Sequence, residues 1–210
     1  MKKSRGSKGI SLIECINPRL TKYRVRFALA EYVDKEFGGS GKEFYELEYQ
    51  YKPQLETIVK DIIAAIPDEP INLTEIATMA EILDEEPLEP MRKALLHNVD
   101  IYNVSDAIDS FTLQGKQMWL PYERRVGLVN SVTNEKRAGK EVTVLWYDGV
   151  RYELPVDTAL QMLAALDLYA LECYNVTEAH KAQVLALSDV SAIVAYDYTA
   201  GYPEKLSFNI

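Results

Sequence analysis

Residues 155–188 read PVDTALQMLAALDLYALECYNVTEAHKAQVLALS, and this stretch decides how the rest of the chain can fold. Mostly apolar residues recur in it at alternating steps of four and three, which places them in one stripe along an α-helix. The stripe comprises Ala159, Leu163, Leu166, Ala170, Cys173, Thr177, His180, Val184 and Leu187. At about 1.5 Å per residue such a helix would be roughly 45–50 Å long. Asp157 is expected to cap its first backbone N–H groups.

Two polar residues, Thr177 and His180, interrupt this apolar stripe. A polar break is common in helices that pack in a core, and it also fixes register in coiled coils. Core packing is the favoured interpretation, and a seam between two chains is the alternative. The candidate interface residues of such a seam are Leu163, Leu166, Cys173, His180 and Val184.

Tyrosine and tryptophan are concentrated in the C-terminal half of the sequence. These side chains combine a large contact area with a hydrogen-bonding tip, which suits protein interfaces and sugar-binding surfaces alike. Trp119 and Trp146, which both follow apolar alternating stretches, therefore join the candidate interface residues.

Residues 1–66 predict an N-terminal antiparallel β lobe with one helix. Two stretches alternate apolar and polar residues, KYRVRFALAEY and EFYELEYQY, on either side of the glycine-rich FGGSGK. This arrangement is typical of a hairpin. A helix with one apolar face is expected over residues 54–66 and would pack on the sheet. The basic start, MKKSRGSK, is expected to be a solvated, mobile terminus.

A helical connector is expected over residues 67–104, because the prolines of PDEPI break the chain at its start. Its first helix is predicted over residues 72–83, with Asn72 as N-cap and Glu75 completing a capping-box pattern. Its second helix is predicted over residues 91–98.

Residues 105–210 predict a C-terminal domain of β-hairpins packed on the long helix. FTLQGKQMWL reads as a tight hairpin, and EVTVLWYDGVRYELP reads as a second one that turns at Asp148-Gly149. A helix is expected between the two hairpins. Together with the N-terminal lobe, these elements define an α+β fold class.

Composition narrows the classes of partner. The net charge of −9 disfavours a nucleic-acid partner, which requires a basic surface. No stretch approaches the roughly 18 apolar residues that a membrane span needs, and no apolar run follows Lys8 as a secretory signal would. Cys15 and Cys173 are each expected to be small buried hydrophobes, which makes a reducing compartment the default.

The sequence contains no recognisable chemical motif. His97 and His180 have no histidine or cysteine at the spacing that metal ligands require. FGGSGK lacks the following helix that would present N–H groups to a phosphate. The acidic run over residues 84–89 lacks the glycine turn of a calcium loop. We therefore predict no catalytic, cofactor-binding or metal-ligating residue, no cofactor, and a protein that is not an enzyme.

Five stretches taken together resemble a known family. They are FTLQGKQMWL, ERRVGLVNS, TVLWYDG, ALQMLAALDLYALECYNVTEAHKA and AYDYTAGYPEKLSF. As a set they resemble an uncharacterised family encoded by tailed phages and prophages of gut bacteria, a domain of unknown function found near fibre and tail genes. The resemblance covers residues 111–208 well and the first 70 residues weakly. It implies a virion-associated or assembly role and assigns no catalytic residue.

The leading hypothesis is therefore a non-enzymatic bacteriophage structural protein, part of or adaptor for a head fibre or tail appendage. It would be made in the host cytoplasm and localise to the virion. Its expected partners are other phage structural proteins and copies of itself in a homo-oligomer, with a trimer preferred because fibres are usually threefold. One alternative is an assembly factor or chaperone for fibre or tail subunits. A second is a carbohydrate-binding module that uses Trp119, Trp146 and the tyrosines.

Overall fold

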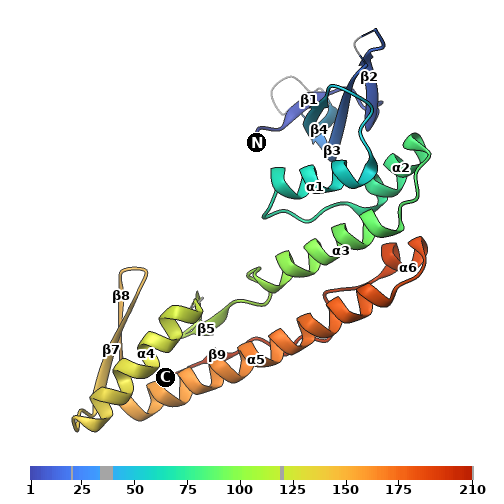
Figure 1. The fold of residues 1–210 in the computed structure, drawn as a ribbon. Coiled ribbons are helices and arrows are strands. Elements are labelled where there is room, and N and C mark those ends of the chain that lie inside the picture. Colours follow the sequence, from blue (N-terminus) through green and yellow to red (C-terminus); the bar gives the residue numbers. More distant parts are fainter. Residues whose placement is uncertain (20, 34–39, 119–120, 210) are drawn as a thin grey trace. The chain divides into compact units, whose positions relative to one another are not determined.

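The computed structural model describes residues 1–19, 21–33, 40–118 and 121–209 of the chain. Contacts divide the chain into two compact units. Unit 1 comprises residues 1–101 and 180–198, and unit 2 comprises residues 102–179 and 199–210. Both units combine helices with β-sheets (Figure 1), so the predicted α+β class is confirmed.

Unit 1 opens with a four-stranded antiparallel sheet in the order β1-β4-β3-β2. Its strands are β1 (Ser4–Gly6), β2 (Ile13–Asn17), β3 (Lys22–Val33) and β4 (Ser40–Tyr49). The pair β3–β4 is the hairpin that the two alternating stretches predict. The expected turn in FGGSGK starts at residues 37–39, which lie outside the described residues.

Residues 4–6 form a strand of this sheet, so the prediction of a mobile terminus is wrong for them, although all three are exposed to solvent as expected. These residues pair with residues 42–44 of β4. The guanidinium of Arg5 also lies 3.1 Å from the carboxylate of Glu43 on the neighbouring strand. The strand β1 therefore covers the edge of β4 that a plain hairpin would leave open.

In the described part of the chain, four helices lie wholly or mostly in unit 1. They are α1 (Leu55–Ala65), α2 (Leu73–Leu83), α3 (Leu88–Asn103) and α6 (Val190–Ala195), and residues 180–186 at the end of α5 (Val156–Ala186) also belong to this unit. Phe27 of β3, Ile58 of α1, Ile76 of α2 and Leu95 of α3 are all buried in one core. The structure therefore differs from the expected separate connector over residues 67–104, because the apolar faces of α2 and α3 are buried in the same core as the sheet. The helix α3 is also longer than the predicted 91–98.

Asn98 fixes the segment between α1 and α2 to α3. Its side chain is buried, and its Oδ1 accepts a hydrogen bond from the backbone N–H of Ile71 at 2.7 Å. Its Nδ2 donates to the carbonyl oxygen of the same residue at 2.9 Å. One amide side chain thus satisfies both backbone groups of a buried residue, which would otherwise cost free energy.

Glu75 has a different role from the predicted capping box. Asn72 does cap α2, since its Oδ1 accepts from the N–H groups of Thr74 and Glu75. The carboxylate of Glu75, however, accepts from the backbone N–H groups of Ala28 and Leu29, both at 2.8 Å. These two residues form an irregularity in β3, where Ala28 has φ 52°. The α2 helix therefore supplies acceptors to donors that the strand ladder leaves unpaired.

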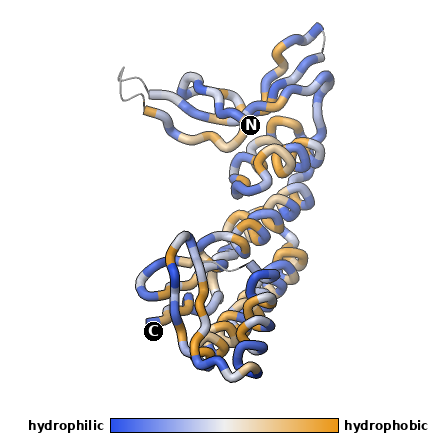
Figure 2. Tube along the Cα trace, turned by 90° about the vertical axis from the view of Figure 1, so that its left-hand side faces the viewer, coloured by the Kyte–Doolittle hydropathy of each residue, from blue (hydrophilic) through white to orange (hydrophobic). Residues whose placement is uncertain are grey.

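Unit 2 contains two small sheets and two helices. Its strands are β5 (Phe111–Leu113), β6 (Lys116–Met118), β7 (Val142–Tyr147), β8 (Val150–Pro155) and β9 (Ser207–Phe208), and its helices are α4 (Tyr122–Arg137) and the first part of α5 (Val156–Ala186). The strand β5 pairs antiparallel with β6 and parallel with β9, and β7 pairs antiparallel with β8. Residues from α4, α5 and both sheets share one core, and Figure 2 shows hydrophobic and hydrophilic residues mixed along these elements.

Both predicted hairpins of unit 2 are confirmed. Gln114 and Gly115 turn the first with φ values of 50° and 76°, and Asp148 and Gly149 turn the second with 48° and 73°. Two successive positive φ values define a type I′ turn, whose twist matches that of the strands.

The long helix α5 runs over 31 residues, close to the prediction. Asp157 is not its cap, because it lies inside the first turn, 2.7 Å from Lys136.

Gly41 provides a test of how β1 is held. A Cβ atom built on Gly41 would lie 2.2 Å from the carbonyl oxygen of Gly6, which is far closer than any real contact. We therefore expect Gly41→Ala to separate β1 from β4 and to remove hydrogen-exchange protection from the β1 amides. Gly9→Ala, whose Cβ would meet nothing within 4 Å, should leave that protection unchanged. Equal protection in the two variants would contradict the pairing.

Candidate functional site

The five stripe residues proposed for an inter-chain seam are buried within the chain. Leu163 and Leu166 lie in the core of unit 2, Cys173 packs with Tyr169, and Val184 lies in the core of unit 1. His180 is also buried. The interface interpretation of these residues is therefore corrected in favour of core packing, because each already contacts its own unit.

The polar members of the stripe have partners within their own units. The hydroxyl of Thr177 lies 2.8 Å from Oδ1 of Asn103 and 3.0 Å from the hydroxyl of Tyr202, both in unit 2. The Nδ1 atom of His180 lies 2.7 Å from the hydroxyl of Tyr196 in unit 1. These bonds offset the desolvation of buried polar groups, so the polar break belongs to the core and needs no second chain.

Trp146 is the predicted interface residue that the structure leaves exposed, with 65% of its surface accessible. It shares the outer face of β7 with Val142 and Val144, which are also exposed. Among the described residues, β7 pairs with β8 alone, so its other edge carries backbone groups without a neighbouring strand. Trp119, the other predicted tryptophan, lies outside the described residues.

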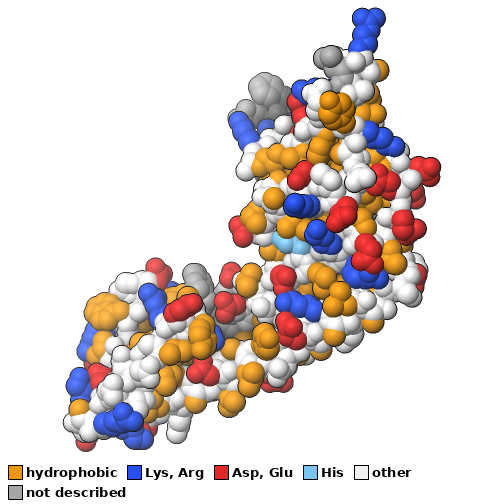
Figure 3. Space-filling view, viewed as in Figure 1, with side chains coloured by type: hydrophobic (Ala, Val, Ile, Leu, Met, Phe, Trp, Pro, Cys, Tyr) orange, Lys and Arg blue, Asp and Glu red, His pale blue; other side chains and the backbone are white. Residues whose placement is uncertain are grey.

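The outer face of α5 carries a second set of exposed apolar residues that sequence reasoning missed. Leu168 and Leu171 are 69% and 55% accessible, and Tyr174 is also exposed. Ala164, Leu168, Leu171 and Asn175 follow steps of four, three and four, which is the spacing of the buried stripe displaced around the helix. That repeat was the available signal, since one helix can carry two stripes and only one of them can face its core. Figure 3 shows hydrophobic side chains among charged ones on the visible surface.

An apolar cavity of about 240 Å³ is lined by residues of the β7–β8 hairpin, the β5–β6 hairpin, α4 and α5. Its lining includes Val144 and Trp146 from the β7–β8 hairpin, Leu128 from α4, and Met162 and Leu163 from α5. Apolar walls of this kind suit the side chains of a protein partner. The exposed row of β7 and this cavity together form the hairpin surface.

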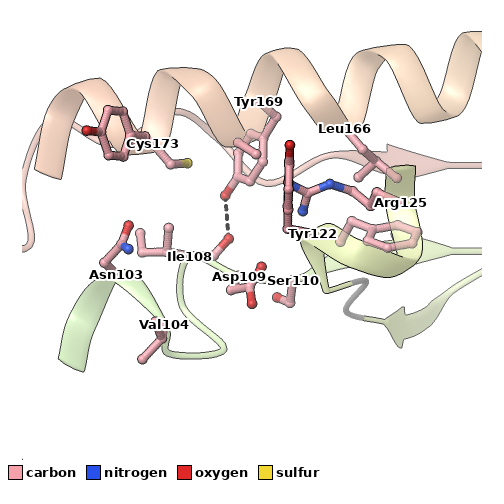
Figure 4. Close-up of a pocket in the computed structure, with 13 residues that line it drawn as sticks. Asn103, Val104, Ile108, Asp109, Ser110, Tyr122, Arg125, Leu166, Tyr169 and Cys173 are labelled. Carbon is pink, nitrogen blue, oxygen red and sulfur yellow. Dashed lines mark hydrogen bonds between the residues drawn. The ribbon is translucent and has the colours of Figure 1, made fainter. Parts of the chain in front are cut away.

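A second cavity of unit 2, of about 210 Å³, combines aromatic and charged side chains (Figure 4). Arg125 and Tyr122 lie at one end and Cys173 and Asn103 at the other, as the close-up shows. Asp109 lies between the two ends, and we call this cavity the Asp109 pocket. Its charged and aromatic side chains come from three separate segments and gave no sequence signal, because no local spacing connects a loop, the start of α4 and the middle of α5.

The Asp109 pocket contains a mostly buried guanidinium and groups with shifted pKa values. The guanidinium of Arg125 is mostly buried and donates from Nε to the carboxylate of Asp167 at 3.0 Å. Burial raises the pKa of Asp109, the nearby Arg125 lowers it, and Asp106 raises it further. Burial also raises the pKa of the Cys173 thiol, which therefore stays protonated at neutral pH.

The remaining sequence predictions about chemistry have mixed outcomes. Cys173 is buried as expected, whereas Cys15 is exposed, so the prediction for Cys15 is wrong. Strand alternation would place Cys15 on the face of the buried Ile13, but Cys15 lies where the register of β2 with β3 becomes irregular, and it is exposed. No group of three metal-ligating side chains occurs among the described residues. Within the same residues, no helix is both long and apolar enough to cross a membrane.

Comparisons with protein-family models, with curated proteins and with solved structures found no match to this chain. The fold and the two surfaces define the class as an α+β protein with an exposed apolar hairpin and helix face in unit 2. Any function must therefore be argued from those surfaces.

Proposed function

We propose that the protein is a non-enzymatic bacteriophage virion protein that acts through protein–protein contacts, as part of or adaptor for a head fibre or tail appendage. The observation that supports this proposal is the exposed apolar surface of unit 2, namely the hairpin surface and the outer face of α5. Exposed apolar surface of this kind marks interaction sites, because leaving it in water is unfavourable. The family resemblance of residues 111–208 supplies the phage context.

The partners in this proposal are other phage structural proteins and further copies of the chain, with a trimer preferred. Tryptophan is among the residues that contribute most to binding energy at protein interfaces. Trp146 is therefore the side chain whose loss should affect assembly most.

We expect the isolated protein to associate in a concentration-dependent manner, and Trp146→Ser to weaken that association about tenfold or more. The measurement is sedimentation velocity over a range of protein concentrations. The matched control is Tyr51→Ser, which removes another highly exposed aromatic residue, in unit 1. Strictly monomeric wild-type protein at high concentration would overturn self-association, and equal weakening by both variants would overturn the role of Trp146.

An assembly factor for fibre or tail subunits is the alternative with the same surfaces. Mass spectrometry of purified particles separates the two proposals, because a virion protein stays in the finished particle and an assembly factor leaves it.

A carbohydrate-binding module is a further candidate, favoured by the exposed indole of Trp146, since aromatic faces stack on sugars. A glycan array that gives no signal would remove it.

A further inference from the structure

Within the part of the chain that the structure describes, the Asp109 pocket has one charged group without a hydrogen-bond partner. The hydroxyl of Tyr169 donates to the carbonyl oxygen of Ile108 at 2.9 Å, and Nε of Arg125 is bound to Asp167 at 3.0 Å. Among the described residues, the carboxylate of Asp109 has no hydrogen bond or salt bridge, although the charge of Arg125 attracts it from a distance. Asp109 is itself exposed, and a cation that approaches its carboxylate favours the charged form of that group.

The charges around the pocket leave it net negative at this point. Arg125 is bonded to Asp167 and also attracts Asp109, and Asp106 adds another acidic group nearby, so three carboxylates accompany one guanidinium. The ammonium of Lys205 donates to the backbone carbonyl of Asp106 at 3.0 Å and to the hydroxyl of Ser110 at 3.2 Å, so its hydrogen bonds go elsewhere than to Asp109. A cationic ligand is therefore favoured over an anionic one.

Size and aromatic content narrow the ligand further. A volume of about 210 Å³ lies below the roughly 300–1,000 Å³ of sites that enclose a drug-sized molecule, so it suits a single side chain. Tyr122 and Tyr174 line the pocket and are exposed, so their rings are available at its mouth. Tyrosine faces attract cations, and apolar atoms of the wall suit the methylene stem of a long basic side chain.

We propose that the Asp109 pocket receives a basic side chain of a protein partner, arginine in preference to lysine, with Asp109 as its counter-ion and Tyr122 and Tyr174 beside it. The planar guanidinium can bind a carboxylate through two parallel hydrogen bonds and stack on an aromatic ring at the same time, whereas an ammonium cannot. The assignment of the ligand to a protein partner rests on the proposed function above. The preference for the cation itself rests on the pocket alone.

The test is an NMR titration of the full-length, ¹⁵N-labelled protein with N-acetyl-arginine amide. We expect saturable shifts of amides in residues 108–111 and 169–174, weaker shifts with N-acetyl-lysine amide, and none with N-acetyl-citrulline amide, the uncharged isostere of arginine. Asp109→Asn should weaken arginine binding about tenfold or more, because it removes the charge-assisted bonds. Asp106→Asn removes the same charge from a residue that does not line the pocket, so it should weaken arginine binding less than Asp109→Asn does.

Equal responses to arginine and citrulline, or equal losses in the two aspartate variants, would overturn the proposal. The comparison of arginine with citrulline needs no variant, so it decides the question even if Asp109→Asn does not fold. Tyr122→Ser, which changes an exposed side chain, should also weaken binding. Since the probes are small molecules and the protein is isolated, a negative titration refutes the pocket assignment and leaves the virion proposal standing. Absence of the protein from purified particles would refute the virion proposal and leave the pocket assignment standing.

Discussion

Glu75→Ala is expected to lower the free energy of unfolding of unit 1 by about 2–4 kcal/mol, because two backbone donors would lose their acceptor. The carboxylate of Glu75 accepts at 2.8 Å from both Ala28 and Leu29, at the irregularity where β3 departs from its pairing with β4. Urea denaturation followed by circular dichroism measures the change. The matched control is Glu81→Ala, which removes an exposed carboxylate from the same helix and should cost less than about 0.5 kcal/mol.

Glu75→Gln separates the acceptor role from the charge. Glutamine keeps one acceptor oxygen and points an N–H₂ group at the second donor, so an intermediate loss is expected. Burial raises the pKa of Glu75, and the bonds from Leu29 and Ala28 lower it by a smaller amount. A raised pKa means that the folded state binds the proton more tightly than the unfolded chain.

The stabilisation from protonation is therefore fully present below the ordinary glutamate pKa and is lost as the pH rises through the raised value. We expect the wild-type protein to show this fall in unfolding free energy and Glu75→Gln to lack it. If Glu75→Ala, Glu75→Gln and Glu81→Ala all unfold at the same urea concentration, the carboxylate of Glu75 does not stabilise β3.

Local patterns predicted the elements of this fold well, for identifiable reasons. Asp148-Gly149 adopts the two positive φ values that the dipeptide favours, and Asn72 caps its helix as its position indicates. Such features depend on residues a few positions apart, so the sequence displays them directly. The expected hairpins and helices follow from the same local chemistry.

Contacts between residues that are distant in the sequence could not be predicted from local patterns. The spacing of Glu75 from Asn72 indicates a capping box, but its carboxylate binds residues 28 and 29, more than forty positions away. The prolines of PDEPI correctly mark a break, yet no local signal shows that α2 and α3 share a core with the sheet. The Asp109 pocket likewise depends on the meeting of three separate segments.

The long helix α5 shows the same limit most clearly. Its 4-3 spacing correctly predicts the buried stripe, but the spacing does not show which segments cover one face of the helix and leave the other exposed. The structure buries Leu163 and exposes Leu168. The choice depends on where α4 and the β7–β8 hairpin pack against the helix, and that packing is set by contacts distant in sequence.

Leu163→Ala should therefore destabilise unit 2 by about 3–4 kcal/mol, since it leaves a cavity in a fully buried site. Leu168→Ala removes the same atoms from the exposed face of the same helix and should change the unfolding free energy by no more than about 0.5 kcal/mol. If the outer face of α5 binds another protein chain, Leu168→Ala should instead weaken association in sedimentation velocity. A large loss of stability in Leu168→Ala together with a small one in Leu163→Ala would reverse the assignment of the two faces.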